Sequence, residues 1–480
     1  MNQPNVLWVC SDQQRFDMAS VYGNPFVKTP SAERLAEEGT LFEYAFSQSP
    51  VCSPSRASFL TGRYPRTTRC RQNGQAIPPD ERLVTKVLAE NGYICGLSGK
   101  LHIATCSPRF RPAGEERIDD GYAEFHWMHH PDPHWTTQEY AHWLRERGEA
   151  YRRHSRPESR FLHTTMPAEL HPTTWCAQKA INFIEAHEGK SSPWLFSVNF
   201  FDPHHPFDPP EEYLERYMSR LDEIPLPNYT DGELENKPVF QQANHHGAYN
   251  QPRNLPYSKM DENDHRCVRA GAWAMCDLID DQLGRMMDAL EATGQRENTI
   301  VIFMSDHGEM LGDHGIYLKG PFFYEEAVRV PLIISCPSRF QKGVKSGALT
   351  ELTDIAPMLL DAAGIEREPG MQGRSLHPLL TGETADEEHR EDVYSEYYNA
   401  MPHHQNPQAH MTMVRTGTHK LVAAHGLDVW ELYDLENDPG EVVNRWNDPD
   451  YARVQTEMTM RLADRMAWTV DPLPERIGAY

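Results

Sequence analysis

Residues 299–309 read TIVIFMSDHGE, and this stretch sets the first expectation for the fold. Thr299 to Met304 is a β-branched run of strand length that leads almost directly into the acidic Asp306. A second short apolar run, Val6 to Cys10, is followed in the same way by Asp12. In open parallel sheets, ligands bind beyond the carboxyl ends of the strands. The two stretches therefore predict a sheet in which two separate strands deliver acids to one edge.

Apolar runs alternate with helical patterns along much of the chain. The clearest helical pattern extends from Val268 to Leu290, with apolar side chains three and four residues apart and Gly294 after its end. Further strands are predicted at 94–98, 194–200 and 332–335, and further helices at 29–39, 83–90 and 354–363. This alternation predicts the α/β class.

The character of the sequence changes after residue 380. Strands are predicted at 393–398, within 411–424 and at 430–434, and an amphipathic helix follows at 451–468. We therefore expect a large α/β domain over residues 1–380 that carries the chemistry, and a smaller α+β subdomain over residues 381–480. Two stretches in the large domain lose the α/β pattern, and we expect insertions at about 104–171 and 222–264.

The composition is that of a soluble globular protein, with 39% hydrophobic and 24% charged residues. The net charge of −24 argues against nucleic acid or an anionic membrane as the main partner. Nine cysteines without any CxxC pair disfavour a disulfide framework and a zinc ribbon. Because a strand is predicted almost at the first residue, we expect a cytoplasmic enzyme, or a periplasmic or secreted one whose leader was removed.

Oxygen-bearing side chains follow both of the strands that set the fold. Asp12 and Gln13 come after the first, and Asp306 and His307 come after the second. Carboxylate and amide oxygens suit a hard divalent cation such as Ca²⁺ or Mg²⁺. Taken alone, Asp12 or Asp306 is better explained as a side chain that caps a loop. The string DHGE from Asp306 is a poor helix start, however, and this favours a bound ligand.

A cysteine lies near the start of a predicted helix. Ser53 fits its N-cap, Pro54 its first position, and Gly62 its end. Cys52 would then lie beside free backbone N–H groups and Arg56, a location that stabilises an anion and activates a thiolate. Most cysteines are simply buried, but the polar neighbours here weaken that interpretation.

Basic side chains follow other strands or lie in Gly- and Pro-containing loops. A lone His near Pro is more often a loop hydrogen-bonding group than a catalyst. Together, these loops could surround one anion, as a sulfuryl or phosphoryl group requires. The basic residues are Lys100, His102, His204, His205 and Lys319.

The string CSPSRASFLTGR at residues 52–63 resembles the signature of the type I, formylglycine-dependent sulfatases. The resemblance continues, in order, through most of the first 370 residues. It implies an alkaline-phosphatase-like α/β sandwich, with a large mixed sheet flanked by helices and a smaller C-terminal antiparallel sheet packed with a helix. The matching positions are Asp12-Gln13, GKLH at 99–102, His204, SDHGE at 305–309, Lys319 and 325–331.

The resemblance implies a sulfatase that releases inorganic sulfate from a carbohydrate or small organic sulfate ester. Cys52 would be oxidised to formylglycine by a maturation enzyme. One hydroxyl of the hydrated aldehyde would attack sulfur, and the second would eject sulfate. This two-step route explains why a plain thiol would not suffice.

The resemblance also assigns roles to the surrounding residues. Asp12, Gln13, Asp306 and His307 would hold one divalent metal, most often Ca²⁺, with Mg²⁺ or Mn²⁺ as alternatives. Arg56 and Lys100 would hold the diol, and His102 would assist its proton loss during release. His204 and Lys319 would contact sulfate and protonate the leaving oxygen.

Some positions depart from the common sulfatase pattern. Gln13 and His307 resemble the residues of phosphonate monoester and phosphodiester hydrolases, close relatives that also use formylglycine. The GKLH string and Ser55 favour a sulfatase, so the phosphonate or phosphodiester hydrolase remains the alternative. A non-catalytic binder of sulfated glycans is a third possibility, but it would require lost catalytic positions, and we find none.

Substrate contacts outside these motifs are harder to predict. Asn73 lies in a stretch that resembles a substrate-contacting segment of the phosphonate hydrolases, and His205, His246 and His404 are further candidates. The His- and Trp-rich segment 126–142 could form a wall for a sugar ring or a packed loop, and both interpretations stay open. The sequence leaves homo-oligomer formation undecided.

Overall fold

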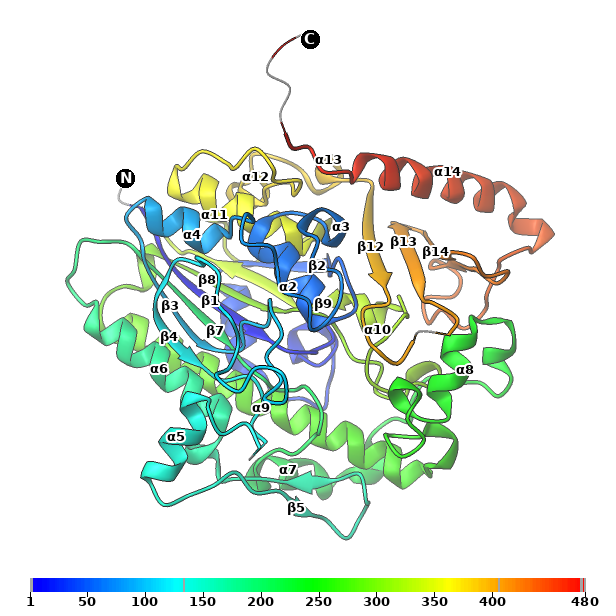
Figure 1. Ribbon diagram of the computed structural model, residues 1–480, viewed down its shortest axis with the longest axis horizontal. Coiled ribbons are helices and arrows are strands. Elements are labelled where there is room, and N and C mark those ends of the chain that lie inside the picture. The colour runs from blue at the N-terminus through cyan, green and yellow to red at the C-terminus, as the bar shows by residue number, and fades with distance from the viewer. Residues whose placement is uncertain (1–2, 133, 405, 475–477, 479–480) are drawn as a thin grey trace.

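The structure is a computed structural model that describes residues 3–132, 134–404, 406–474 and 478. Within these residues a nine-stranded sheet forms the centre of the molecule, in the order β11-β2-β10-β8-β1-β7-β3-β4, with β9 paired to β2 (Figure 1). Its strands are β1 (Asn5–Ser11), β2 (Thr40–Phe46), β3 (Ile94–Gly99), β4 (Tyr122–Trp127), β7 (Trp194–Asn199), β8 (Thr299–Ser305), β9 (Arg329–Val330), β10 (Leu332–Ser335) and β11 (Val344–Glu351).

The strands that lead to the predicted acids are direct neighbours. β1 pairs in parallel with β8, and Ser11 lies opposite Ser305 in the register. Asp12 and Asp306 therefore leave the same edge of the sheet at the same level. β10 runs antiparallel to β8, so the sheet is mixed.

Helices cover both faces of the sheet because β1 is apolar on both sides, as a buried parallel strand requires. Val6 and Trp8 point into a core shared with Phe59, whereas Leu7 and Val9 point into the opposite core. The first face carries α2 (Cys52–Thr61), α4 (Val84–Glu90) and α11 (Ile355–Ala363), and the second carries α1 (Pro30–Glu37), α6 (Pro172–Ala186) and α9 (Glu262–Ala292) (Figure 1). The helix α7 (Glu211–Met218) packs on α9.

A separate four-stranded antiparallel sheet follows near the C-terminus, and the helix α14 (Ala452–Trp468) packs on it. This arrangement confirms the predicted fold class. Lys420 of this sheet is buried and contacts Glu325 at 2.9 Å, Glu441 at 2.7 Å and the carbonyl of Phe323 at 2.9 Å. These contacts anchor the segment that follows Lys319 on the C-terminal sheet, whose strands are β12 (Asp392–Tyr398), β13 (His410–Thr416), β14 (His419–Ala424) and β15 (Glu431–Asp434).

Smaller elements complete the described part of the chain, in which no helix is long and apolar enough to cross a bilayer. Part of the expected insertion at 104–171 belongs to the main sheet, since β4 pairs in parallel with β3. The elements not yet placed are α3 (Pro65–Thr68), α5 (Glu139–Glu146), α8 (Val239–His245), α10 (Glu325–Val328), α12 (His377–Thr381), α13 (Asp386–His389), β5 (His154–Ser155) and β6 (His163–Thr164).

One local prediction was wrong. Ser53 is not the N-cap of α2, because the helix already begins at Cys52 and Val51 is its N-cap. The predicted end is confirmed, with Gly62 in the left-handed region at φ 68°. The earlier start places Cys52 in the first turn itself.

Candidate active site

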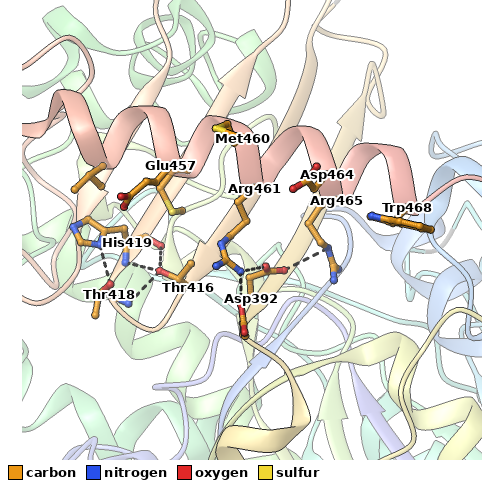
Figure 2. A pocket seen from close by; sticks show the side chains of 13 residues that line it. Asp392, Thr416, Thr418, His419, Glu457, Met460, Arg461, Asp464, Arg465 and Trp468 are labelled. Atoms are coloured by element: carbon orange, nitrogen blue, oxygen red, sulfur yellow. Dashed lines mark hydrogen bonds and ion pairs between the residues drawn. The ribbon is translucent and has the colours of Figure 1, made fainter.

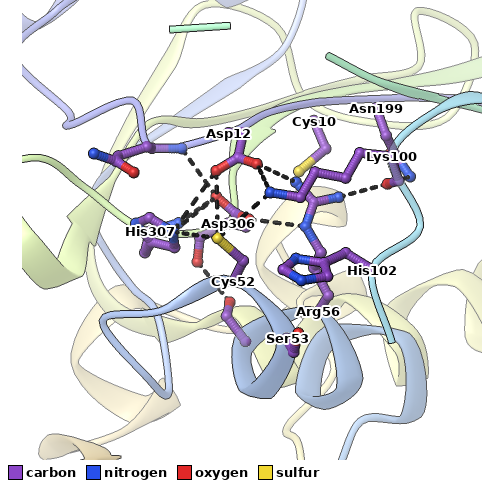
Figure 3. Close-up of polar contacts among 12 residues, drawn as sticks. Cys10, Asp12, Cys52, Ser53, Arg56, Lys100, His102, Asn199, Asp306 and His307 are labelled. Atoms are coloured by element: carbon purple, nitrogen blue, oxygen red, sulfur yellow. Dashed lines mark hydrogen bonds and ion pairs between the residues drawn. The ribbon is translucent and has the colours of Figure 1, made fainter. Parts of the chain in front are cut away.

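Six loops or element ends bring the predicted catalytic and metal-binding residues towards one buried point, the Sγ of Cys52. Figure 3 shows four of these segments, which carry Asp12, Arg56, Lys100 and His307. Cys52 is 1% exposed. Its Sγ lies 2.9 Å from Nζ of Lys319, 3.2 Å from Nε2 of His307 and 3.6 Å from Nζ of Lys100. Burial and the Asp12 carboxylate oppose ionisation of the thiol, but the two lysines and His307 outweigh them and lower the pKa of Cys52. The position therefore favours an anionic group.

Two buried carboxylates offset part of the positive charge around Cys52. Arg56 Nε donates to Asp306 Oδ2 at 2.9 Å, and its Nη2 lies 3.6 Å from Asp12 Oδ2. Lys100 Nζ donates to the same oxygen of Asp12. Although burial favours the neutral acid, Lys100 and Lys319 hold the pKa of Asp12 well below its usual range. Three cations facing two carboxylates leave this cluster with an excess of one positive charge, apart from His307.

The same residues fit a divalent metal ion. One ligand atom from each of Asp12, Cys52, Asp306 and His307 lies within 4.8 Å of the others. His307 Nδ1 is 2.9 Å from the carbonyl of Gly308, so donation there leaves the lone pair of Nε2, which faces Cys52 Sγ and Lys319 Nζ, as the metal-binding atom. Gln13 Oε1 is buried and has no hydrogen-bond partner. An unpartnered buried oxygen beside two carboxylates is what a hard cation would satisfy.

Gln13 is held in place by its backbone and by its amide nitrogen. Its φ is 70°, its backbone N–H donates to Asp306 Oδ1 at 3.0 Å, and its Nε2 donates to Glu309. Glu309 also accepts from the backbone N–H groups of Leu311 and Leu318 at 3.0 and 2.6 Å. Glu309 therefore orients Gln13 so that Oε1 is left for a ligand.

The loop after β3 brings Lys100 and His102 to the site. His102 has a φ of 57°, and the backbone N–H groups of His102, Ile103 and Ala104 all donate to the carboxylate of Glu115, at 2.9, 2.6 and 3.1 Å. Burial, reinforced by Lys100, lowers the pKa of His102 well below its usual range, so its imidazole is neutral. Glu115 was not predicted from the sequence, because no motif marks it.

His204 and His205 follow β7. His204 Nδ1 is 2.6 Å from the carbonyl of His205, and the two rings stack at 4.3 Å. Burial and the Lys319 ammonium lower the pKa of His204 well below its usual range. The loop after β7 therefore brings a second neutral imidazole to the site, near Lys319, in addition to that of His102 in the loop after β3.

The three remaining substrate candidates have other partners. Asn73 Oδ1 accepts from the backbone N–H of Ser53 at 2.9 Å, so its side chain caps the start of α2. His404 is buried between Tyr397 and Asn244, at 3.0 and 3.1 Å, and lies beside Gly320 next to Lys319. His246 is the exposed C-cap residue of α8, where it contacts Ser258 at 3.0 Å and packs against the ring of His245.

Tyr249 is a further residue that the sequence did not predict. Its backbone has a φ of 59°, its hydroxyl is buried without a partner, and its ring lies 5.6 Å from that of His205. The Cys52 and Asp12 charges are close enough to contribute to the raised pKa of this phenol, after burial and Glu309. An unsatisfied hydroxyl near the site is available to a substrate.

Two cavities differ in their relation to this site. A cavity of about 550 Å³ borders His205 and is lined by the basic residues Arg160, Arg253 and Lys259. A larger cavity of about 800 Å³ lies under α14, where Arg461 and Arg465 already pair with Asp392 (Figure 2). Only the first of these two cavities adjoins residues of the candidate site.

Residues 4–365 match the family model described as Sulfatase, and residues 312–467 match that of the N-sulphoglucosamine sulphohydrolase C-terminal region. An arylsulfatase of Clostridium perfringens is 29% identical, over 94% of this chain and 91% of its own. An N-acetylglucosamine-6-O-sulfatase of Bacteroides thetaiotaomicron is 26% identical, over 98% of this chain and 88% of its own. Among solved structures, a phosphonate monoester hydrolase of Agrobacterium radiobacter is 27% identical with a TM-score of 0.84. The match covers 98% of this chain and 97% of the hydrolase chain.

Proposed function

This chain belongs to the sulfatase family, and we propose that it hydrolyses the sulfate ester of a carbohydrate or of a small organic alcohol, releasing inorganic sulfate. The observation that carries the proposal is the convergence of Lys100, Lys319 and His307 on Cys52 at the start of α2. A position with this electrostatic environment suits an anionic nucleophile and an anionic substrate alike.

Cys52 is proposed to act after conversion to formylglycine, whose hydrated aldehyde supplies an attacking oxygen and a second hydroxyl for release of sulfate. Lys100, within 3.6 Å of Sγ, stabilises the negative charge at this position, and Arg56 holds the neighbouring carboxylates. His102 is neutral and can accept a proton during release.

His204 and Lys319 are proposed to bind the sulfate group and supply the proton for the leaving oxygen. Lys319 Nζ already lies 2.9 Å from the Cys52 Sγ. In the free protein the imidazole of His204 is neutral, because burial lowers its pKa. A bound sulfate anion nearby would favour the protonated form, since an opposite charge raises the pKa of an imidazole.

Asp12, Gln13, Asp306 and His307 are proposed to hold one divalent metal ion, with Ca²⁺ as the preferred ion. The unpartnered Gln13 Oε1 and the two carboxylates support a hard cation. Such an ion would orient the nucleophile and a sulfate oxygen. His307 is a softer ligand than oxygen, so Mg²⁺ and Mn²⁺ should be compared with Ca²⁺.

A carbohydrate substrate is supported by the resemblance to the N-acetylglucosamine-6-O-sulfatase. The cavity beside His205 is large enough, at about 550 Å³, for a sugar-sized group. Its basic residues, Arg160, Arg253 and Lys259, would favour an alcohol part that carries a further negative charge.

A phosphonate monoester or phosphodiester hydrolase is the second candidate. It is favoured by the TM-score of 0.84 and 27% identity to the phosphonate monoester hydrolase of Agrobacterium radiobacter. Gln13 and His307 also resemble residues of that group. Both substrate classes present a tetrahedral anion, so the same cations can serve either.

A paired kinetic assay tests the proposal. Matured protein, confirmed by mass spectrometry of the Cys52 peptide, is stripped of metal and assayed with Ca²⁺, Mg²⁺ or Mn²⁺ on an aryl sulfate, a phosphate diester and a phosphonate monoester. We expect the highest kcat/KM on the sulfate ester with Ca²⁺. A higher kcat/KM on the phosphonate or diester would establish the second candidate instead.

Glu115 offers a test of how the loop positions His102. In Glu115→Gln an NH2 group replaces one of the two carboxylate oxygens that accept from the backbone N–H groups of residues 102–104. The loop then loses acceptors that position His102, so we expect kcat to fall by about 10- to 100-fold. Ca²⁺ affinity should not change, because Glu115 is not among the metal residues. The neighbouring Glu116→Gln removes only an exposed pair with Arg111 and should leave kcat within about twofold. An unchanged kcat in Glu115→Gln would rule out this positioning role.

A further inference from the structure

A second group of potential metal ligands lies beside the active site but shares no residue with the proposed calcium ligands. It consists of His102, Cys106 and His129. One ring nitrogen from each histidine and the Cys106 Sγ all lie within 4.8 Å of one another. The three side chains are 5–8% exposed. Figure 3 shows that one of them, His102, lies beside Arg56, close to the catalytic centre.

Each histidine of this group has one ring nitrogen without a partner within the described residues. Nδ1 of His102 and Nδ1 of His129 are both buried without a hydrogen-bond partner. Buried imidazole nitrogens usually have a partner, so two orphaned ones from different loops call for an explanation. Their rings lie 4.4 Å apart, and Trp135 stacks on His129 at 4.8 Å, which holds that ring in place.

The geometry is close to that of a zinc site with three protein ligands. With Zn–N bonds of about 2.0–2.1 Å and a Zn–S bond of about 2.3 Å, tetrahedral ligand atoms are about 3.3–3.6 Å apart. Ligand atoms at the 4.8 Å limit would have to approach one another by about 1.2–1.5 Å. Three protein ligands leave a fourth position open, as in many zinc sites that bind water or a substrate.

The charges around His102, Cys106 and His129 are compatible with a bound cation, and they do not favour a hard cation over a soft one. Lys100 lies near both histidines and opposes a cation, but the carboxylate of Glu115 lies near Cys106 and holds the backbone of His102. Loss of the Cys106 proton to solvent, as the S–metal bond forms, adds a negative charge. Two imidazoles and a thiolate prefer Zn²⁺-like ions, whereas the oxygen-rich group at Asp12 prefers Ca²⁺.

We propose that His102, Cys106 and His129 form an inhibitory site for a thiophilic divalent cation of the Zn²⁺ class. The bound ion occupies an imidazole nitrogen of His102 and prevents that side chain from accepting a proton during sulfate release. Binding depends only on these three side chains. The inhibition additionally rests on the proposed function, in which His102 acts in catalysis.

Binding is tested without catalysis, in Cys52→Ala protein, which has no thiol at the calcium site. With that site saturated by Ca²⁺, titration with Co²⁺ should produce the sulfur-to-cobalt charge-transfer absorption of one thiolate per chain. The absorption should vanish in Cys52→Ala/Cys106→Ser and in Cys52→Ala/Cys106→Ala. It should persist in the matched Cys52→Ala/Cys70→Ser, because Cys70 is also buried but is not one of the three proposed ligands, and its Sγ donates to the carbonyls of Ser53 and Gln75. Absorption that survives loss of Cys106, or no absorption at all, would overturn the site.

Inhibition is tested in matured protein with Ca²⁺ in excess. We expect Zn²⁺ to inhibit reversibly, and Cys106→Ser or Cys106→Ala to raise the half-inhibiting concentration by about 10- to 100-fold at unchanged basal kcat. Cys70→Ser should behave like the parent. Equal inhibition of parent and Cys106 variants would refute the inhibitory role. If no sulfate ester is hydrolysed at all, the proposed function fails, but the cobalt result still decides the site.

Discussion

Cys52→Ala is expected to lower kcat for sulfate-ester hydrolysis by about 10⁴- to 10⁶-fold, the range seen when a nucleophile is removed from an otherwise intact enzyme. The Cys52 side chain is the point on which Lys319, His307 and Lys100 converge. No other nucleophile occupies that position among the described residues of the cluster. Activity is measured on an aryl sulfate with matured parent protein as the reference.

Two controls separate loss of the nucleophile from loss of the site. Ca²⁺ affinity and melting temperature should be nearly unchanged in Cys52→Ala, since Asp12, Gln13, Asp306 and His307 all remain. Cys52→Ser keeps one hydroxyl but lacks the second that releases sulfate, so it should accumulate a sulfated protein detectable by mass spectrometry. Full activity in Cys52→Ala would refute both the sulfatase and the phosphonate hydrolase proposals.

Arg56→Ala is expected to destabilise the fold by about 3–5 kcal/mol in the presence of a chelator, as removal of one partner from a buried ion pair does. Arg56 is fully buried, donates to Asp306 at 2.9 Å and to the carbonyl of Lys100 at 2.8 Å, and lies 3.6 Å from Asp12. Its loss leaves two buried carboxylates with less compensating charge. Excess Ca²⁺ should restore part of the lost stability, because the ion binds the same carboxylates. Chemical denaturation with and without Ca²⁺ measures both effects.

Arg63→Ala is the matched control. Arg63 is also a buried arginine, just beyond α2, but it pairs with Glu81 at 3.3 Å and Asp471 at 2.9 Å, away from the metal residues. Its loss should lower stability without changing the stabilisation by Ca²⁺. Arg56→Lys keeps the charge but not the planar fork, so we expect an intermediate loss. If Arg56→Ala unfolds like the parent in chelator, Arg56 does not balance the two carboxylates as described.

Much of the fold could be predicted because its signals are local. The β-branched run at 299–304 and the apolar spacing of 268–290 predict a strand and a helix, and β8 and α9 include them. β4 escaped prediction because its sequence, YAEFHW, is an edge strand with mixed exposure inside a polar segment. The N-cap of α2 was misplaced by two residues, from Val51 to Ser53, because a serine followed by a proline is typical of an N-cap and a first helical position.

The candidate site was predictable where a motif joins chemistry to a strand end or a helix start, as at Asp12, Cys52 and Asp306. Residues that hold the site in place by hydrogen bonds to distant backbone groups could not be predicted. Glu115 has no sequence signal, because its role depends on three N–H groups that only the folded loop directs at it. Asn73 and His246 were both predicted as substrate contacts, but the Asn73 side chain caps α2, and His246 is the exposed C-cap residue of α8.

The sequence by itself determined the α/β alternation, the family and the residue types that the chemistry needs, because each of these depends on short contiguous segments of the chain. The tertiary structure alone decided which side chains share a point in space. Asp12 and Asp306 are 294 residues apart in sequence but adjacent through the register of β1 with β8. His102, Cys106 and His129 likewise become one group only when the loop after β3 folds against the segment that follows β4. The physical reason is that distances between side chains depend on strand pairing and loop packing, which no local pattern encodes.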